Sequence, residues 1–269
     1  MPSPVALTNT EKVMPMLSES TINKLFEMRL NSMAQTFRDQ ITDDVYASMP
    51  FEERFGLLVD SEWYRRRNNR LTRLIKKAEY VYPHACIEDI NYSPSRHLDK
   101  GQIARLSSCN YIRECNNIII LGATGTGKSY LSCALGAAAN RNFYAAKYIR
   151  LTDLFSELAV ARGEGSYQKV IKVYKTVKLL ILDDWLLLKL NEIEARDLLD
   201  LVEARYRRNS TIFCSQFEVT GWFPKIGNDT IADAICDRIV HNAYTIVLKG
   251  ESLRKEKRVG DPDTIPNNQ

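Results

Sequence analysis

A glycine-rich loop directly after a short apolar run is the feature that most restricts the fold of this chain. The apolar run is Ile118 to Leu121, and the loop after it fits the pattern G-x-x-x-x-G-K-[ST] at every fixed position. An apolar helical pattern follows, with Leu131, Leu135 and Ala138 on one side. In a strand–loop–helix setting this pattern cradles the phosphates of a nucleoside triphosphate. The sequence therefore predicts an α/β protein with a phosphate-binding loop; the alternative is a glycine-rich turn that happens to contain Lys-Ser.

The chemistry of the loop assigns a role to each position. Its glycines let backbone N–H groups point at the phosphates, Lys128 reaches the β- and γ-phosphates, and the Ser129 hydroxyl ligates Mg²⁺. We therefore expect ATP and Mg²⁺ as cofactors. The expected nucleotide-binding residues of the loop are Gly122, Ala123, Thr124, Gly125, Thr126, Gly127, Lys128, Ser129 and Tyr130.

The chain around this loop alternates between strand and helix patterns. Strands are expected at 117–121, 146–151, 178–182, 210–215 and 244–248, and a short helix at 99–108. The alternation indicates a central parallel sheet covered by helices on both faces. The first 80 residues or so instead repeat apolar residues at helical spacing, which predicts a small all-helical domain. The expected organisation is a mobile N-terminus at 1–17, a helical DNA-binding domain at 18–82, a linker at 83–98, an ATPase domain at 99–258 and a flexible tail at 259–269.

Two acidic residues, Asp183 and Asp184, end the apolar run from Leu179 to Leu182. They are typical of the second half of an ATPase site. In this interpretation Asp183 holds Mg²⁺ through water, and Asp184 orients or polarises the attacking water. Paired acids at a strand end also occur as simple turn formers, which is the alternative.

The positive charge of the chain is concentrated between Trp63 and Lys77, where no acidic residue interrupts the basic ones. On a helix, Arg66, Arg70, Arg73 and Lys77 share one face. Such a face suits the phosphate backbone of duplex DNA; the alternative is a solvated face that keeps the protein soluble. The expected DNA-binding residues are Arg65, Arg66, Arg67, Arg70, Arg73 and Lys77.

Composition favours an ordinary soluble protein. The chain is 45% hydrophobic and 26% charged, with a net charge of +4, and its apolar runs are too short to span a membrane. Six cysteines are scattered without a C-x-x-C motif or metal-ligand spacing. Reduced thiols and a cytoplasmic, bacterial location are therefore expected.

Further segments make a resemblance to a known family specific. The segments lie at 28–40, 51–55, 65–77, 122–129, 182–185, 194–199, 215–216, 231–234, 237–243 and 248–255. In them the sequence resembles the IstB family of transposition helper ATPases, relatives of the DnaC helicase loaders within the AAA+ superfamily. The resemblance implies a homo-oligomer with ATP at its subunit interfaces, which assembles on duplex DNA and recruits and stimulates a partner transposase.

The resemblance also implies roles for three more residues. Gln216 would be the sensor that positions water beside the γ-phosphate, and Arg238 would enter the neighbouring subunit's site as an arginine finger. Arg254 would be a second sensor that contacts the nucleotide. The alternatives are that Gln216 caps a strand end, that Arg238 pairs with Asp237 or Asp233, and that Arg254 is a surface residue.

The sequence departs from the family pattern at four positions. Leu186 stands where glycine is usual, Cys214 replaces a common threonine, and Tyr130 replaces a frequent histidine. Asp184 stands where many AAA+ ATPases carry glutamate, and its shorter reach predicts slow hydrolysis.

Three other functions stay open on the sequence. A DnaC-like replicative helicase loader would dock its N-terminal helices on a helicase. A small-molecule phosphotransferase would need an acceptor pocket and a lid of arginines. A nucleotide-gated DNA-binding module would scarcely hydrolyse ATP.

Overall fold

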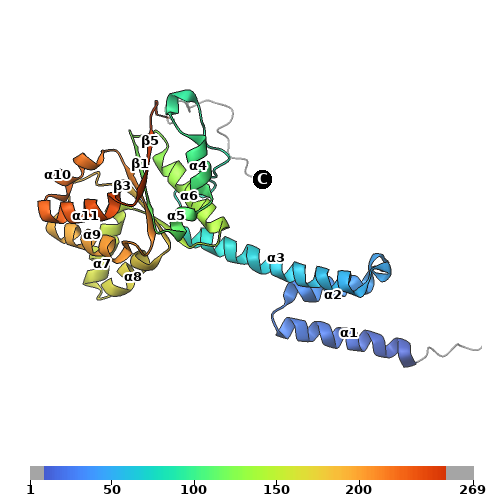
Figure 1. Ribbon diagram of the computed structural model, residues 1–269. Coiled ribbons are helices and arrows are strands. Elements are labelled where there is room, and N and C mark those ends of the chain that lie inside the picture. The colour runs from blue at the N-terminus through green and yellow to red at the C-terminus, as the bar shows by residue number, and fades with distance from the viewer. Residues whose placement is uncertain (1–8, 253–269) are drawn as a thin grey trace, which may run out of the picture. The chain divides into compact units, whose positions relative to one another are not determined.

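The computed structural model describes residues 9–252, with side chains from residue 18 onward (Figure 1). The predicted tail at 259–269 and Arg254 lie outside these residues, as do residues 1–8 of the predicted mobile N-terminus. Contacts within the chain divide it into two compact units that meet between Thr72 and Arg73. The domain boundary expected after residue 82 stays a prediction.

The first unit is helical. It contains α1 (Asn9–Glu27), α2 (Asn31–Thr42), the short 3-10 helix η1 (Asp44–Ser48) and most of the long helix α3 (Phe51–Ala78). Its buried apolar side chains are few, among them Ile22, Ala34 and Leu58.

A buried carboxylate on α3 is the main polar anchor of this unit. Glu62 is 5% exposed, and its carboxylate accepts hydrogen bonds from the Ser32 backbone N–H (3.1 Å), from Arg66 Nε (2.7 Å) and from Arg65. Arg65 also donates to the Arg29 carbonyl at 3.2 Å, in the turn between α1 and α2. Burial by itself raises the pKa of Glu62, but the hydrogen bonds from Arg65, Arg66 and Ser32 outweigh it and lower the pKa to about 2. Arg65 and Arg66 thus help to hold the helical unit together.

The second unit is built on a five-stranded sheet in which all neighbouring strands are parallel. Its strands are β1 (Asn117–Gly122), β2 (Ala146–Arg150), β3 (Leu179–Trp185), β4 (Ser210–Ser215) and β5 (Ala243–Leu248), in the order β2-β3-β4-β1-β5. All five strand predictions are confirmed, with ends displaced by at most three residues. The largest displacement is at β3, which runs on through Asp183 and Asp184.

Helices cover both faces of this sheet (Figure 1). They are α4 (Lys100–Ser107), α5 (Asn110–Arg113), α6 (Lys128–Arg141), α7 (Leu151–Gly163), α8 (Tyr167–Thr176), α9 (Glu192–Arg205), α10 (Phe223–Ile226) and α11 (Asp229–Val240), with 3-10 turns η2 (Pro94–Arg96) and η3 (Val219–Gly221). Along β1, Ile118 and Ile120 join one core cluster with α4 and α6, and Ile119 joins another with α7, α9 and α11. Alternate residues of one strand thus serve opposite layers, as in a doubly covered parallel sheet.

Four of the six cysteines, Cys109, Cys133, Cys214 and Cys236, are buried, and all six are free thiols. Within residues 9–252, no helix combines the length and the apolar character needed to cross a membrane.

Candidate nucleotide-binding site

Three adjacent strands bring the predicted ATPase residues to one edge of the sheet. In the order β3-β4-β1, the carboxyl ends of the strands carry Asp183 and Asp184, then Gln216, then the loop that begins at Gly122. Leu121 of β1 is paired in register with Ser215 of β4, so the loop and Gln216 follow side by side. Ligands of parallel α/β sheets bind at this carboxyl edge. The structure thus places the predicted residues of the two motifs and Gln216 at one edge of the sheet.

The loop itself requires glycine at several positions. Gly125 and Gly127 have φ values of 84° and 93°, which strain any residue with a side chain. A Cβ atom at Gly122 would lie 2.6 Å from the Leu248 carbonyl oxygen. The loop therefore turns tightly between β1 and α6 and passes close to the end of β5.

Lys128 opens α6 and is only 7% exposed. Its Nζ donates to the carbonyl oxygens of Gly122 (2.7 Å) and Ala123 (3.0 Å). No side chain in the described part of the chain caps α6 at Gly127. The first N–H groups of a 14-residue helix and a buried ammonium group therefore share one site, a combination that suits phosphate.

Asp183 has the setting of an outer ligand for Mg²⁺. It is 3% exposed, and its two oxygens accept hydrogen bonds from the Asp184 backbone N–H (2.9 Å) and from the Tyr148 hydroxyl (2.6 Å). Burial and the neighbouring Asp183 carboxylate raise the pKa of Tyr148 well above its ordinary value, so the phenol keeps its proton and donates. Ser129 lies in the first turn of α6, at the same edge of the sheet. The hydroxyl and carboxylate oxygens at this edge are of the kind that Mg²⁺ prefers, so these residues would fit the ion.

Asp184 lies where β3 departs from regular pairing. Its φ is 50°, and the register with β4 shifts between Leu182 and Trp185. Arg150 at the end of β2 approaches the Asp184 carboxylate to 3.7 Å. Burial and then the Asp183 charge raise the pKa of Asp184, while Arg150 and Lys128 oppose the shift. Asp184 therefore takes a proton more readily than a solvated aspartate does.

The structure shows the surroundings of three residues that depart from the family pattern. Leu186 has a φ of 50° and is fully buried, so it carries a strain of about 1–2 kcal/mol that glycine would not have. Burial of its side chain in the core around α7 and α9 offsets that strain. Cys214 is fully buried, with its Sγ 4.0 Å from the Lys128 carbonyl oxygen. The Tyr130 hydroxyl accepts a hydrogen bond from the Cys86 N–H at 3.5 Å.

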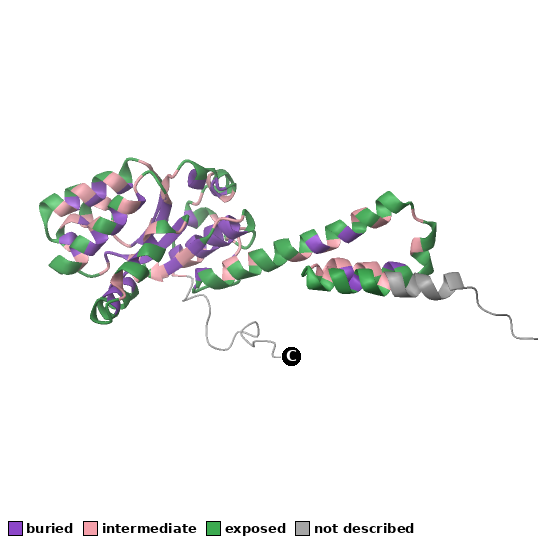
Figure 2. Cartoon of the chain, turned by 90° about the horizontal axis from the view of Figure 1, so that it is seen from below, coloured by how far each residue is buried: buried purple, intermediate pink, exposed green. Residues whose placement is uncertain are grey.

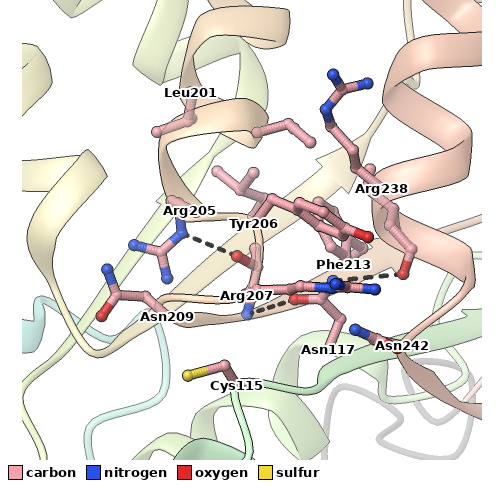
Figure 3. A pocket seen from close by; sticks show the side chains of 14 residues that line it. Cys115, Asn117, Leu201, Arg205, Tyr206, Arg207, Asn209, Phe213, Arg238 and Asn242 are labelled. Atoms are coloured by element: carbon pink, nitrogen blue, oxygen red, sulfur yellow. Dashed lines mark hydrogen bonds between the residues drawn. The ribbon is translucent and has the colours of Figure 1, made fainter.

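Arg238 lies at the other end of the sheet, apart from the loop of its own chain. It lines a hollow with Arg205, Asn117 and Asn242, near the amino ends of β1 and β4 (Figure 3). Its guanidinium donates to the Ala234 carbonyl at 2.8 Å and to Glu203 at 2.9 Å. Arg238 thus forms an ion pair within its own chain, as the alternative expects, but its partner is Glu203 on α9 and not Asp237 or Asp233.

A chain of polar contacts in this hollow fixes the end of α11. Arg205 Nε donates to Thr211 Oγ1 (2.9 Å), the Thr211 N–H donates to Asn117 Oδ1 (3.0 Å), and Asn117 Nδ2 donates to the Ile239 carbonyl (3.3 Å) (Figure 3). Burial lowers the pKa of Arg205 to about 9. The helix that carries Arg238 is therefore anchored to two strands of the sheet.

The predicted DNA-binding residues lie on α3, much of whose surface is exposed (Figure 2). Arg66, Arg67, Arg70, Arg73 and Lys77 are exposed, and Arg65 is half-buried. The guanidinium of Arg67 stacks over Trp63, 4.9 Å from the ring centroid.

Pattern analysis missed Tyr148 and Arg150, which contact the two acidic residues from β2. They lie two residues apart, on the same face of a strand that carries no motif. Their partnership follows only from the pairing of β2 with β3, where Arg150 is in register with Asp183.

Comparisons with solved structures concern the fold. The crystal structure of DnaI superposes with a TM-score of 0.53 and 19% identity, covering 63% of this chain and 90% of that one. AMPPCP-bound DnaA from Aquifex aeolicus gives a TM-score of 0.55 and 20% identity over 64% of this chain and 52% of the DnaA chain, so the match spans about half of DnaA. The sheet unit therefore has the AAA+ fold of these proteins, as the sequence predicts.

Comparisons of sequence concern the family. The insertion sequence ATP-binding protein y4pL of Sinorhizobium fredii is 42% identical over 243 residues, covering 90% of this chain and 99% of that one. The ATP-binding protein of insertion sequence IS1162 from Pseudomonas fluorescens is 40% identical over 201 residues, covering 75% and 87%. The profile of the family described as IstB-like ATP binding protein matches residues 23–260. The chain belongs to this family of IstB-like ATP-binding proteins.

Proposed function

We propose that this chain is the ATPase helper of an insertion sequence, which oligomerises on duplex DNA with ATP and recruits and stimulates its transposase. The observation that carries the proposal is the shared edge of β3, β4 and β1, where Lys128, Asp183, Asp184 and Gln216 meet. The names of the relatives support the setting, since y4pL and the IS1162 protein are described as insertion sequence ATP-binding proteins.

The site divides the work of phosphoryl transfer among its residues. The N–H groups of the loop and of α6 bind the phosphates, and Lys128 approaches the β- and γ-phosphates. Ser129 directly and Asp183 through water would hold Mg²⁺, which would supply positive charge beside the phosphates. Asp184 orients the attacking water, and Gln216 holds it beside the γ-phosphate.

A second copy of the chain completes the site in this proposal. Arg238 lies away from the loop within its own chain, so it acts on the nucleotide of a neighbouring copy as an arginine finger. ATP then favours association, because a ligand that binds the assembled form more tightly than the single chain stabilises the assembly by mass action. Hydrolysis would be slow, because Asp184 is one methylene shorter than glutamate.

The helicase loader is the second candidate function, and the likeness to DnaI favours it only at the level of the fold. The support for a small-molecule phosphotransferase is weaker still, because the predicted basic residues gather on α3 and not over the phosphate loop. A nucleotide-gated DNA-binding module would differ from the proposed helper only in its lower rate of ATP hydrolysis.

Duplex binding through α3 is tested by charge reversal at Arg70 and Arg73. Both lie on the exposed face, whereas Arg65 and Arg66 hold Glu62 and would perturb folding if replaced. For the Arg70→Glu, Arg73→Glu variant we expect duplex affinity to fall by at least about tenfold at moderate salt, and the slope of log K against log salt to drop by about 2. Fluorescence anisotropy with a labelled duplex of random sequence measures both quantities.

The matched control is Lys169→Glu with Lys172→Glu on α8, which removes the same charge from exposed positions of the sheet unit. If the control loses as much affinity as the α3 variant, binding reflects net charge alone. Unchanged affinity in the α3 variant together with co-purification of a replicative helicase would favour the loader.

A further inference from the structure

Arg96 ends the short turn η2, ahead of the first helix of the sheet unit, and is only 8% exposed. Its guanidinium donates to the carbonyl oxygen of Thr126 in the phosphate loop. Its own carbonyl accepts a hydrogen bond from the Lys249 N–H at 3.3 Å, just after β5. Arg96 thus lies where the segment before the sheet, the phosphate loop and the segment after β5 meet.

At this junction the Arg96 guanidinium lacks a hydrogen-bond partner at one nitrogen and a carboxylate to balance its charge. Its Nε is buried without a hydrogen-bond partner, and within residues 18–252 no carboxylate lies at ion-pair distance from its guanidinium. Buried cations are normally paired with an anion, because the loss of hydration is otherwise uncompensated. A neutral carbonyl group offers Arg96 an acceptor but no opposite charge.

The surroundings indicate which anion belongs there. Lys128, in the phosphate loop that Arg96 contacts, is a second buried cation. The segment after β5 closes against the loop as well, because a Cβ atom at Gly125 would lie 2.0 Å from Ser252 Oγ. A planar guanidinium with free N–H groups is matched to the oxygens of a phosphate.

We propose that Arg96 is a phosphate-binding residue of the nucleotide site, which contributes a buried positive charge from outside the loop motif to a nucleoside di- or triphosphate. The inference rests on nucleotide binding at the phosphate loop. It deepens that function by adding a phosphate contact from a segment that carries no nucleotide-binding motif. Phosphate supplied as a free ion offers the same chemistry, and the test separates it from the nucleotide.

The test compares Arg96→Met with Arg96→Lys in the full chain. Calorimetry gives the affinities for ADP and for adenosine, and thermal melts give Tm without ligand, with ADP and with inorganic phosphate. We expect Arg96→Met to weaken ADP binding by about tenfold or more and to leave adenosine binding unchanged. Tm without ligand stays the same or rises, since an apolar side chain replaces an unpaired buried charge, and the rise of Tm on adding ADP becomes smaller.

Two variants make the result specific. Arg96→Lys keeps the charge but loses the planar fork, so it should retain part of the ADP affinity. Arg105→Met on α4 removes an exposed arginine of the same region and should bind ADP like the unaltered chain. Inorganic phosphate that raises Tm in the unaltered chain but not in Arg96→Met would show that Arg96 takes phosphate from either source.

If Arg96 had only a structural role, its variants would show different changes in Tm and in ligand affinity. If Arg96 only braces the loop, Arg96→Met lowers Tm without ligand and weakens ADP and adenosine alike, and Arg96→Lys does the same; either result overturns the inference. Equal ADP affinity in Arg96→Met and the unaltered chain also overturns it, while leaving the proposed function intact. Failure of the unaltered chain to bind ADP would overturn both.

Discussion

Replacing Lys128 by alanine is expected to lower ATP hydrolysis by about 10²–10³-fold, the usual effect of removing one preorganised donor from a site where charge develops. Lys128 is 7% exposed, and its Nζ is held by the carbonyls of Gly122 and Ala123 beside the start of α6. The loop's own carbonyl groups therefore hold the side chain in place, and alanine cannot replace its charge. Affinity for ATP should fall as well, because the ammonium contacts phosphate in the bound state too.

Phosphate release and binding of a fluorescent ATP analogue measure the two effects separately. The matched control is Lys169→Ala on α8, an exposed lysine of the same unit, which should behave like the unaltered chain. Hydrolysis by Lys128→Ala at the unaltered rate would mean that Gly122–Ser129 is not the catalytic loop.

Replacing Arg238 by alanine is expected to reduce hydrolysis by a factor on the order of 10³, as for arginine fingers in related chemistry. Binding of ATP to the single chain should change little, because Arg238 lies in the hollow beside Arg205 and Asn117 and not at the loop. Folding should be preserved too, since the lost ion pair with Glu203 is partly exposed and such pairs contribute about 0–1 kcal/mol.

Mixing two inactive variants shows whether Arg238 acts on the neighbouring copy. Asp184→Asn keeps the loop lysine but lacks the carboxylate that orients water, and Arg238→Ala lacks the finger, yet a random mixture contains interfaces with both groups intact. About a quarter of head-to-tail interfaces in an equal mixture would be complete, so hydrolysis should recover to about that fraction.

The control for this experiment is Arg196→Ala, an exposed arginine of α9, which should remain active alone. A mixture that assembles but stays inactive would contradict action in trans. Full activity of Arg238→Ala alone would remove Arg238 from the mechanism altogether.

The sheet could be predicted from sequence because its strands are short apolar runs bounded by helical patterns. β1 and the loop after it obey a local rule in which each glycine has a steric reason, as the φ values of Gly125 and Gly127 show. The same holds for Asp183 and Asp184, whose place at the carboxyl end of β3 follows from the run before them.

The unpredicted features depend on residues that meet only in the folded chain. Tyr148 and Arg96 reach the site from segments without a motif, and their burial and partners cannot be inferred from spacing. The basic run suggested a uniform cationic face, but Glu62, just before it, engages Arg65 and Arg66. The left-handed backbone at Leu186 was likewise invisible, because nothing in the sequence marks a leucine that occupies a glycine conformation.

The central claim, ATP-dependent assembly on duplex DNA, is tested most directly by sedimentation velocity of the full chain. Four samples are compared: protein alone, with ATP, with duplex DNA, and with both, each repeated for Lys128→Ala at low and moderate salt. The account predicts a large assembly that needs ATP and DNA together and is absent in Lys128→Ala. A monomer that binds ATP and sediments identically with and without DNA would contradict it.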